Sequence, residues 1–129
     1  MTNDDSHAAR SAYVHVPFCR HHCGYCNFSV IAGRGDLIEE FLSAIEQEIE
    51  QFTATGLPAG ELKTLYIGGG TPTQLSCDQF RRLFDAITRH YPLAANCEVT
   101  VEANPADVEP DKVATFADLG VNRISLGAQ

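Results

Sequence analysis

The chain has 129 residues with 17 acidic and 9 basic side chains, a length that suits one domain and a balance that gives a formal net charge of −8. Because no cluster of Lys or Arg appears, the positive surface that nucleic acids require is missing, and we expect no nucleic-acid partner. Five cysteines, no apolar leader in residues 1–10 and no apolar run as long as a membrane span together predict a cytoplasmic protein without a transmembrane segment.

The first third of the chain predicts a tail, a strand and a helix. Residues 1–11 are predicted to be a disordered tail, and residues 12–16 are apolar enough for a strand. Asp36, followed three residues later by Glu39, has the pattern of a capping box at the start of a helix. Apolar residues then recur at intervals of three and four, which predicts one buried helix face ending before Gly56. They are Leu37, Ile38, Phe41, Leu42, Ile45, Ile49 and Phe52.

The same unit recurs twice. Residues 62–67 predict a second strand, and Ser76 with Gln79 forms a second capping box before a helix with Phe80, Leu83, Phe84 and Ile87 on its apolar face. Residues 97–101 predict a third strand. Pro110 then suits a helix first turn, Gly120 suits its end, and residues 121–126 predict a fourth strand. Strands that alternate with helices at this spacing predict right-handed crossovers and a parallel sheet.

The chain ends just after the fourth predicted strand. Because a parallel sheet is normally covered on both faces, four strands with three helices would leave apolar surface open. We therefore expect residues 12–129 to be the N-terminal part of a larger, truncated α/β domain. The alternative is a small complete flavodoxin-like sheet, which usually needs a fifth strand and helix.

Three cysteines lie close together in the stretch HVPFCRHHCGYCNF. Cys19, Cys23 and Cys26 have the spacing C-x3-C-x2-C, with no fourth cysteine beside them. Three thiolates suit a four-iron cluster in which one iron stays open for another ligand.

Other uses of these thiols are possible. A zinc site with His21 and His22 would crowd its ligands on one loop, and a thioredoxin-like pair at Cys23 and Cys26 would leave Cys19 without a role. Three reduced cysteines without a joint role are the remaining alternative. The distant Cys77 and Cys97 are predicted to be buried apolar thiols.

Each predicted strand ends in polar or glycine-rich residues, and active sites of parallel α/β folds lie at the carboxyl ends of the strands. The run Gly68–Thr73, GGGTPT, lacks the Lys-Ser/Thr end of a phosphate loop, but its glycines allow close approach of a ligand to the backbone. Glu102 and Asn104 follow the third strand, and Glu102 can accept hydrogen bonds from a ligand. Gln129 follows the fourth strand.

Four motifs in this order, the cysteine loop, GGGTPT, VEANP and NRISLGAQ, resemble the radical S-adenosylmethionine superfamily from about Tyr13 to Gln129. The resemblance extends to its oxygen-independent coproporphyrinogen III oxidases and the related HemW-type haem chaperones. It implies a partial (β/α)6 barrel, of which this chain would hold the first four strands and three helices.

The resemblance also implies cofactors and their ligands. Cys19, Cys23 and Cys26 would hold a [4Fe-4S] cluster whose open iron binds S-adenosylmethionine. An electron donor would reduce the cluster, and cleavage of the sulfonium would give a 5'-deoxyadenosyl radical. No catalytic side chain is assigned; the residues expected near S-adenosylmethionine are Tyr13, Tyr25, Gly69, Gly70, Thr71, Glu102 and Gln129.

Phe28 departs from the oxidase pattern, which has a further cysteine at this position. The resemblance therefore implies most directly a haem chaperone that transfers haem to acceptors, with coproporphyrinogen oxidase activity as the alternative. Residues that bind haem or porphyrin would lie beyond Gln129.

Overall fold

The computed structural model describes residues 8–19, 30–55 and 59–127. Tyr25, Cys23, Cys26 and Gln129 lie outside these ranges, so their predicted roles remain predictions. Phe28, His21 and His22 also lie outside them.

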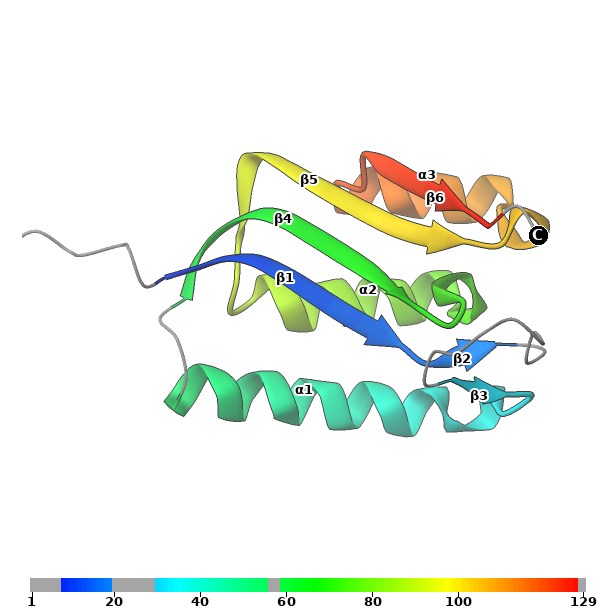
Figure 1. Ribbon diagram of the computed structural model, residues 1–129, viewed down its shortest axis with the longest axis horizontal. Coiled ribbons are helices and arrows are strands. Elements are labelled where there is room, and N and C mark those ends of the chain that lie inside the picture. The colour runs from blue at the N-terminus through cyan, green and yellow to red at the C-terminus, as the bar shows by residue number, and fades with distance from the viewer. Residues whose placement is uncertain (1–7, 20–29, 56–58, 128–129) are drawn as a thin grey trace, which may run out of the picture.

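Four parallel strands form the main sheet, which confirms the predicted parallel topology. The strands are β1 (Ala9–Val16), β4 (Ala59–Gly69), β5 (Leu93–Ala103) and β6 (Arg123–Leu126), in the order β1-β4-β5-β6. Three helices connect them; in the view of Figure 1 the last two lie behind the sheet and the first runs below β1. These helices are α1 (Ile38–Thr55), α2 (Cys77–Thr88) and α3 (Pro110–Leu119).

The strands keep one register at their carboxyl ends. Tyr13 of β1 is opposite Tyr66 of β4, which is opposite Thr100 of β5, and Glu102 of β5 is opposite Ser125 of β6. The register shifts only near the amino ends of β1 and β4, between Ala9 and Ser11 and between Leu62 and Thr64. The carboxyl ends therefore meet as one aligned edge.

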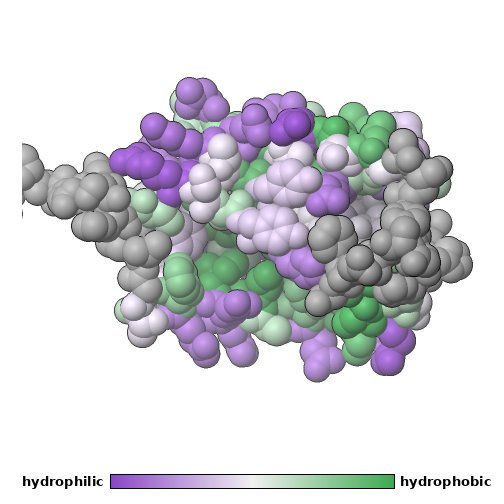
Figure 2. All heavy atoms as spheres, in the orientation of Figure 1, coloured by the Kyte–Doolittle hydropathy of each residue, from purple (hydrophilic) through white to green (hydrophobic). Residues whose placement is uncertain are grey.

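Side chains alternate between the two faces of the sheet, as they must in a strand. Apolar side chains on the helical face are buried: Val14, Val16, Leu65, Ile67, Val99 and Val101. The core also contains an edge-to-face pair of Phe80 in α2 and Phe116 in α3, whose ring centres are 4.8 Å apart. The opposite face carries tyrosines, polar and charged groups, and Figure 2 views the molecule from this side.

One of the two predicted capping boxes is present. The Ser76 side chain accepts from the Gln79 backbone N–H at 3.2 Å, and the Gln79 side chain accepts from the Ser76 N–H at 2.8 Å. The predicted capping box at Asp36 is absent, so that prediction is wrong. Asp36 lies inside a 3-10 turn before α1, and its carboxylate accepts two hydrogen bonds from the Arg34 side chain. Glu39 instead binds Arg82 and the Gln79 side chain on α2.

The other predicted boundaries are close to the observed ones. Pro110 occupies the first turn of α3, and Gly120 ends this helix with a φ of 90°. All four strands were predicted, but β1 begins at Ala9, so Ala9–Ser11 belong to the sheet and not to the predicted tail. No helix in the described part of the chain combines the length and apolar character needed to cross a membrane.

A short second sheet was not predicted. β2 (Phe18–Cys19) pairs in parallel with β3 (Ile31–Ala32), at the carboxyl end of β1 (Figure 1). Phe18 is buried against Phe41 of α1, with the two rings edge to face and their centres 5.5 Å apart. This pairing fixes Cys19 next to the end of the main sheet.

Candidate functional site

The glycine-rich loop after β4 lies directly against Cys19. The backbone N–H of Gly70 donates to the Val16 carbonyl at 2.8 Å, and that of Thr71 donates to the Phe18 carbonyl at 2.6 Å. The Thr71 hydroxyl also donates to the Cys19 sulfur at 3.5 Å. Cys19 is half-buried and carries a free thiol. The loop and the first predicted cluster ligand therefore form one unit.

The glycines of this loop are needed for close backbone contacts. A Cβ atom at Gly70 would lie 2.7 Å from the Phe18 carbonyl oxygen and 2.9 Å from the Cys19 sulfur. Gly69 has a φ of 114°, and a Cβ there would lie 2.8 Å from the Val16 carbonyl oxygen. Neither position accepts a side chain without moving the backbone, which explains why both residues at this turn are glycines.

A second group of side chains lies on the open face of the sheet, which is the face away from the helices. The rings of Tyr13 and Tyr66 stack with their centres 5.9 Å apart and their planes inclined by 23°. The Tyr13 hydroxyl lies 3.1 Å from Nδ1 of His15. Burial, and after it the Glu102 carboxylate, raise the pKa of Tyr13, so the phenol stays protonated.

Glu102 lies over the backbone of Gly68. A Cβ atom at Gly68 would be only 2.1 Å from Oε1 of Glu102 and 2.8 Å from the Tyr66 ring. Tyr66 of β4 lies close enough to Glu102 of β5 and Ser125 of β6 for both to influence its pKa, so three strands meet around this carboxylate. The carboxylate is half-buried and lies on the face away from the helices.

A buried polar network joins the loops that follow β4 and β5. Asp107 is 2% exposed and accepts from Thr73 Oγ1 and Gln74 Nε2, each at 3.4 Å. Thr73 Oγ1 in turn accepts from the Asn104 N–H at 3.2 Å, and the Lys112 ammonium donates to the Thr73 carbonyl at 2.5 Å. These contacts hold the two loops at a fixed separation.

The structure brings together the predicted site residues that it describes. Tyr13, Cys19, Gly69, Gly70, Thr71 and Glu102 all lie along the carboxyl edge of the sheet or on its open face beside it. Cys97 is buried as predicted, but Cys77, at the start of α2, is only half-buried, so that prediction is wrong for it.

Two polar residues near the site have local contacts. Arg123 forms an exposed ion pair with Glu98, with Nη1 and Oε1 3.2 Å apart. The side chain of Asn104 accepts from the Ala106 N–H at 3.1 Å and caps a 3-10 turn.

Sequence reasoning missed Tyr66, His15 and Ser125. The available signal was the alternation of side chains in a strand, because Tyr66 precedes Gly68 by two residues and so points to the same face. Placing Ser125 beside Glu102 also required the register between β5 and β6, which the sequence alone does not give.

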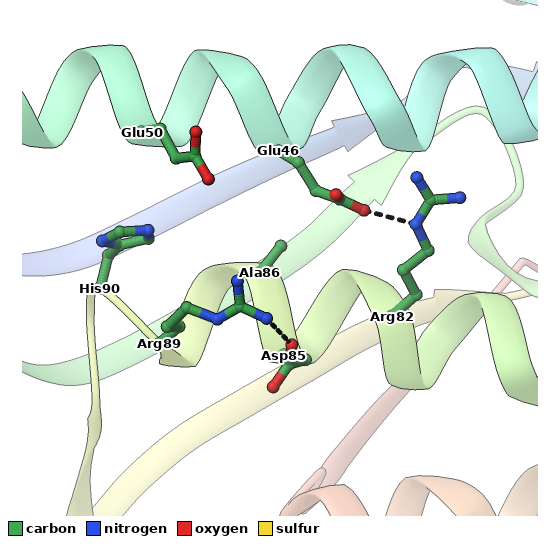
Figure 3. A pocket seen from close by; sticks show the side chains of 7 residues that line it. All are labelled: Glu46, Glu50, Arg82, Asp85, Ala86, Arg89 and His90. Atoms are coloured by element: carbon green, nitrogen blue, oxygen red, sulfur yellow. Dashed lines mark hydrogen bonds and ion pairs between the residues drawn. The ribbon is translucent and has the colours of Figure 1, made fainter.

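A groove of about 230 Å³ lies between α1 and α2, away from this edge. Figure 3 shows that its charges are largely paired: Arg82 contacts Glu46, and Arg89 contacts Asp85. Exposed ion pairs of this kind fix the helices only weakly and do not indicate a ligand.

Among the described residues, no three His, Cys, Asp or Glu side chains converge as a metal site. Cys19 is the only one of the three predicted cluster cysteines in this part of the chain. The arrangement of the three cysteines therefore involves residues outside the described ranges.

Comparison with known proteins identifies the family. The model of the radical SAM superfamily matches residues 13–129. The haem chaperone HemW of Bacillus subtilis is 45% identical over 122 residues, which are 93% of this chain and 32% of that protein. The oxygen-independent coproporphyrinogen III oxidase of Synechocystis is 35% identical over 120 residues, which are 92% of this chain and 26% of that protein.

A solved structure has the same fold. The Escherichia coli coproporphyrinogen III oxidase HemN, described as a radical SAM enzyme, superposes with a TM-score of 0.85 at 33% identity, over 95% of this chain and 28% of that one. This confirms the predicted fold class, a partial (β/α)6 barrel. The chain spans about a third of the length of the HemW relative. With its family model matched from Tyr13 to Gln129, the chain belongs to the radical SAM superfamily.

Proposed function

We propose that this chain provides the cluster-binding and S-adenosylmethionine-binding part of a haem chaperone. The observation that carries the proposal is the contact of Cys19 with the glycine-rich loop: Thr71 Oγ1 lies 3.5 Å from the sulfur, and Gly70 leaves room for it. A superfamily named for S-adenosylmethionine supports the same cofactor.

The described residues fit a [4Fe-4S] cluster. Cys19 offers a half-buried free thiol of the soft type that iron-sulfur clusters require, and the Thr71 hydroxyl can donate to its sulfur. Cys19, Cys23 and Cys26 would hold the cluster. When bound and reduced, it would supply the electron that cleaves the carbon–sulfur bond of S-adenosylmethionine.

The chain's own residues would bind and orient S-adenosylmethionine. Glu102 offers a carboxylate that can accept from hydroxyl or ammonium groups, and Tyr13, two strands away on the same face, offers a protonated phenol. Gly69 and Gly70 leave the loop backbone open to close approach. Tyr25 and Gln129 are proposed to contribute from outside the described residues.

Haem transfer is favoured over porphyrinogen oxidation by two observations. Identity is 45% with a protein named as a haem chaperone and 35% with one named as an oxidase. Phe28 also occupies the position at which the oxidase pattern has a further cysteine. Oxidative decarboxylation of coproporphyrinogen remains the second candidate, favoured by the structural match to an oxidase.

Electron paramagnetic resonance tests the cofactor part of the proposal. In the full-length protein, reconstituted without oxygen and reduced, we expect a cluster signal that changes when S-adenosylmethionine is added. Cys19→Ala should abolish the cluster, whereas Cys77→Ala, at the start of α2, should retain it. Zinc in place of iron, or a signal unchanged by S-adenosylmethionine, would contradict the proposal.

Two assays separate the candidate functions. Spectral titration of the full-length protein with haem should show saturable binding if it is a chaperone. Anaerobic incubation with coproporphyrinogen and S-adenosylmethionine should leave the porphyrinogen unchanged. Decarboxylation of its propionates would instead establish the oxidase activity.

A further inference from the structure

The Glu102 carboxylate is held by a neighbour on the adjacent strand. Tyr66 of β4 precedes Gly68 by two residues and shares its face, and Gly68 leaves the space in which both side chains meet. A Cβ at Gly68 would lie 2.1 Å from Oε1 of Glu102, 3.0 Å from its Cδ and 2.8 Å from Cε1 of Tyr66. The carboxylate and the phenol ring thus converge over one missing side chain.

The ring of Tyr66 is itself fixed on both sides. Tyr13 of β1 stacks on one side of it, with ring centres 5.9 Å apart, and on the other side Glu102 and Ser125 are near enough to influence its pKa. Burial, and then the charge and hydrogen bond of Glu102, raise the pKa of Tyr66, while Ser125 and Arg123 act in the opposite direction. The phenol therefore stays neutral, the form in which its O–H is able to donate to the neighbouring carboxylate.

We propose that Tyr66 is a positioning residue that orients the Glu102 carboxylate toward S-adenosylmethionine. This inference rests on the proposed function, because it assigns Glu102 as a ligand contact. Without the Tyr66 hydroxyl, the carboxylate would keep its charge but lose a charge-assisted hydrogen bond that limits its rotation. Ligand binding would then have to order it, at a cost in affinity.

The test measures binding of radiolabelled S-adenosylmethionine by equilibrium dialysis to the full-length, cluster-loaded protein. Tyr66→Phe keeps the ring that stacks on Tyr13 and removes only the hydroxyl. We expect about tenfold to hundredfold weaker binding, the range for one hydrogen bond to a charged group. Tyr91→Phe is the matched control, because the buried Tyr91 hydroxyl has no hydrogen-bond partner in the described structure. The affinity of Tyr91→Phe for S-adenosylmethionine should equal that of the wild type.

The double variant Tyr66→Phe/Glu102→Gln distinguishes positioning from a direct contact. If Tyr66 acts through the Glu102 carboxylate, removing its hydroxyl should weaken binding little further once that carboxylate is gone. A full additional loss in the double variant, or wild-type affinity in Tyr66→Phe, would overturn the inference and leave the proposed function standing. Absence of binding to the wild type, with the cluster present, would instead overturn the proposed function.

A readout independent of the cofactor accompanies the binding assay. In protein without cluster, the tyrosinate titration of Tyr66 should shift when Glu102 becomes Gln, because the two side chains are in contact before any ligand binds. An unchanged titration would show that Glu102 and Tyr66 do not interact, and would overturn the inference even if both variants bind S-adenosylmethionine weakly.

Discussion

Glu102 is one of the groups that influence the pKa of Tyr66 on the open face of the sheet. Burial and the neighbouring carboxylate raise the pKa of Tyr66 above its ordinary value of 10.0, because ionisation would place two negative charges side by side. The protonated phenol is therefore the form that the folded site contains at neutral pH. Its protonation can be followed without any cofactor.

Glu102→Gln should lower the pKa of Tyr66, because the amide carries no negative charge to oppose ionisation. The measurement is the tyrosinate absorbance in the near ultraviolet as pH rises, with Tyr66→Phe subtracted in each background to remove the other tyrosines. The transition should move to lower pH in Glu102→Gln. A transition that stays in place or moves to higher pH would show that the carboxylate does not act on Tyr66.

Gly68→Ala should destabilise the protein and weaken S-adenosylmethionine binding, because the new methyl group would occupy the positions of Glu102 Oε1 and the Tyr66 ring. Forcing an extra carbon into a filled site costs about 1–3 kcal/mol, measured as the free energy of unfolding in urea. Gly35→Ala is the control, since a Cβ there would meet only Ile38 Cδ1 at 4.0 Å. Equal stability of the two variants would contradict the crowding seen at Gly68.

At the scale of single elements, local patterns predicted more than long-range contacts did. The apolar repeat of α1 and the Ser76 capping box depend on neighbours within one helix. Both are present, except that Phe52, near the end of α1, is 49% exposed and does not belong to the predicted buried face. The pairing of β2 with β3 was missed, because it joins residues on the two sides of the cysteine loop. Asp36 had the right spacing for a cap, but Arg34 lies two residues away and binds its carboxylate.

Ser76→Ala and Asp36→Ala should therefore differ in their cost, although both residues fit the sequence pattern of a cap. Loss of the Ser76 cap should lower the free energy of unfolding by about 1 kcal/mol, because it removes the hydrogen-bond acceptor for the Gln79 N–H. Loss of the exposed ion pair between Asp36 and Arg34 should leave the free energy of unfolding almost unchanged. Urea denaturation measures both, and a larger loss from Asp36→Ala would restore the capping assignment.

At the scale of the whole molecule, the alternation of strands and helices was enough to predict the parallel sheet. It also predicted that Cys19, the glycine-rich loop and Glu102 would meet at one edge, which the structure shows for these residues. The details of their contact were not predictable, because they depend on the register between strands. Tyr66 is the clearest example: its role follows only when β4 is aligned with β1 and β5.

β6 is an edge strand with exposed apolar side chains: Ile124 is 37% exposed and Leu126 is 56% exposed. Exposed apolar edge strands favour pairing between molecules. The 129-residue chain should therefore self-associate at high concentration, and Leu126→Lys should reduce this association. Sedimentation velocity measures it, with Phe52→Lys on α1 as a control of similar exposure. Equal effects of the two substitutions would show that the edge strand is not responsible.

The two register shifts near the amino ends of β1 and β4 have a consequence for changes in chain length. An inserted residue near Leu62 can be absorbed where the ladder is already irregular, so Tyr66 and Gly68 keep their orientation. With the start of the strand held in place, deletion of Leu65 would turn both residues toward the helices. A change in chain length is therefore tolerated better where β4 begins than in its last residues before the carboxyl edge.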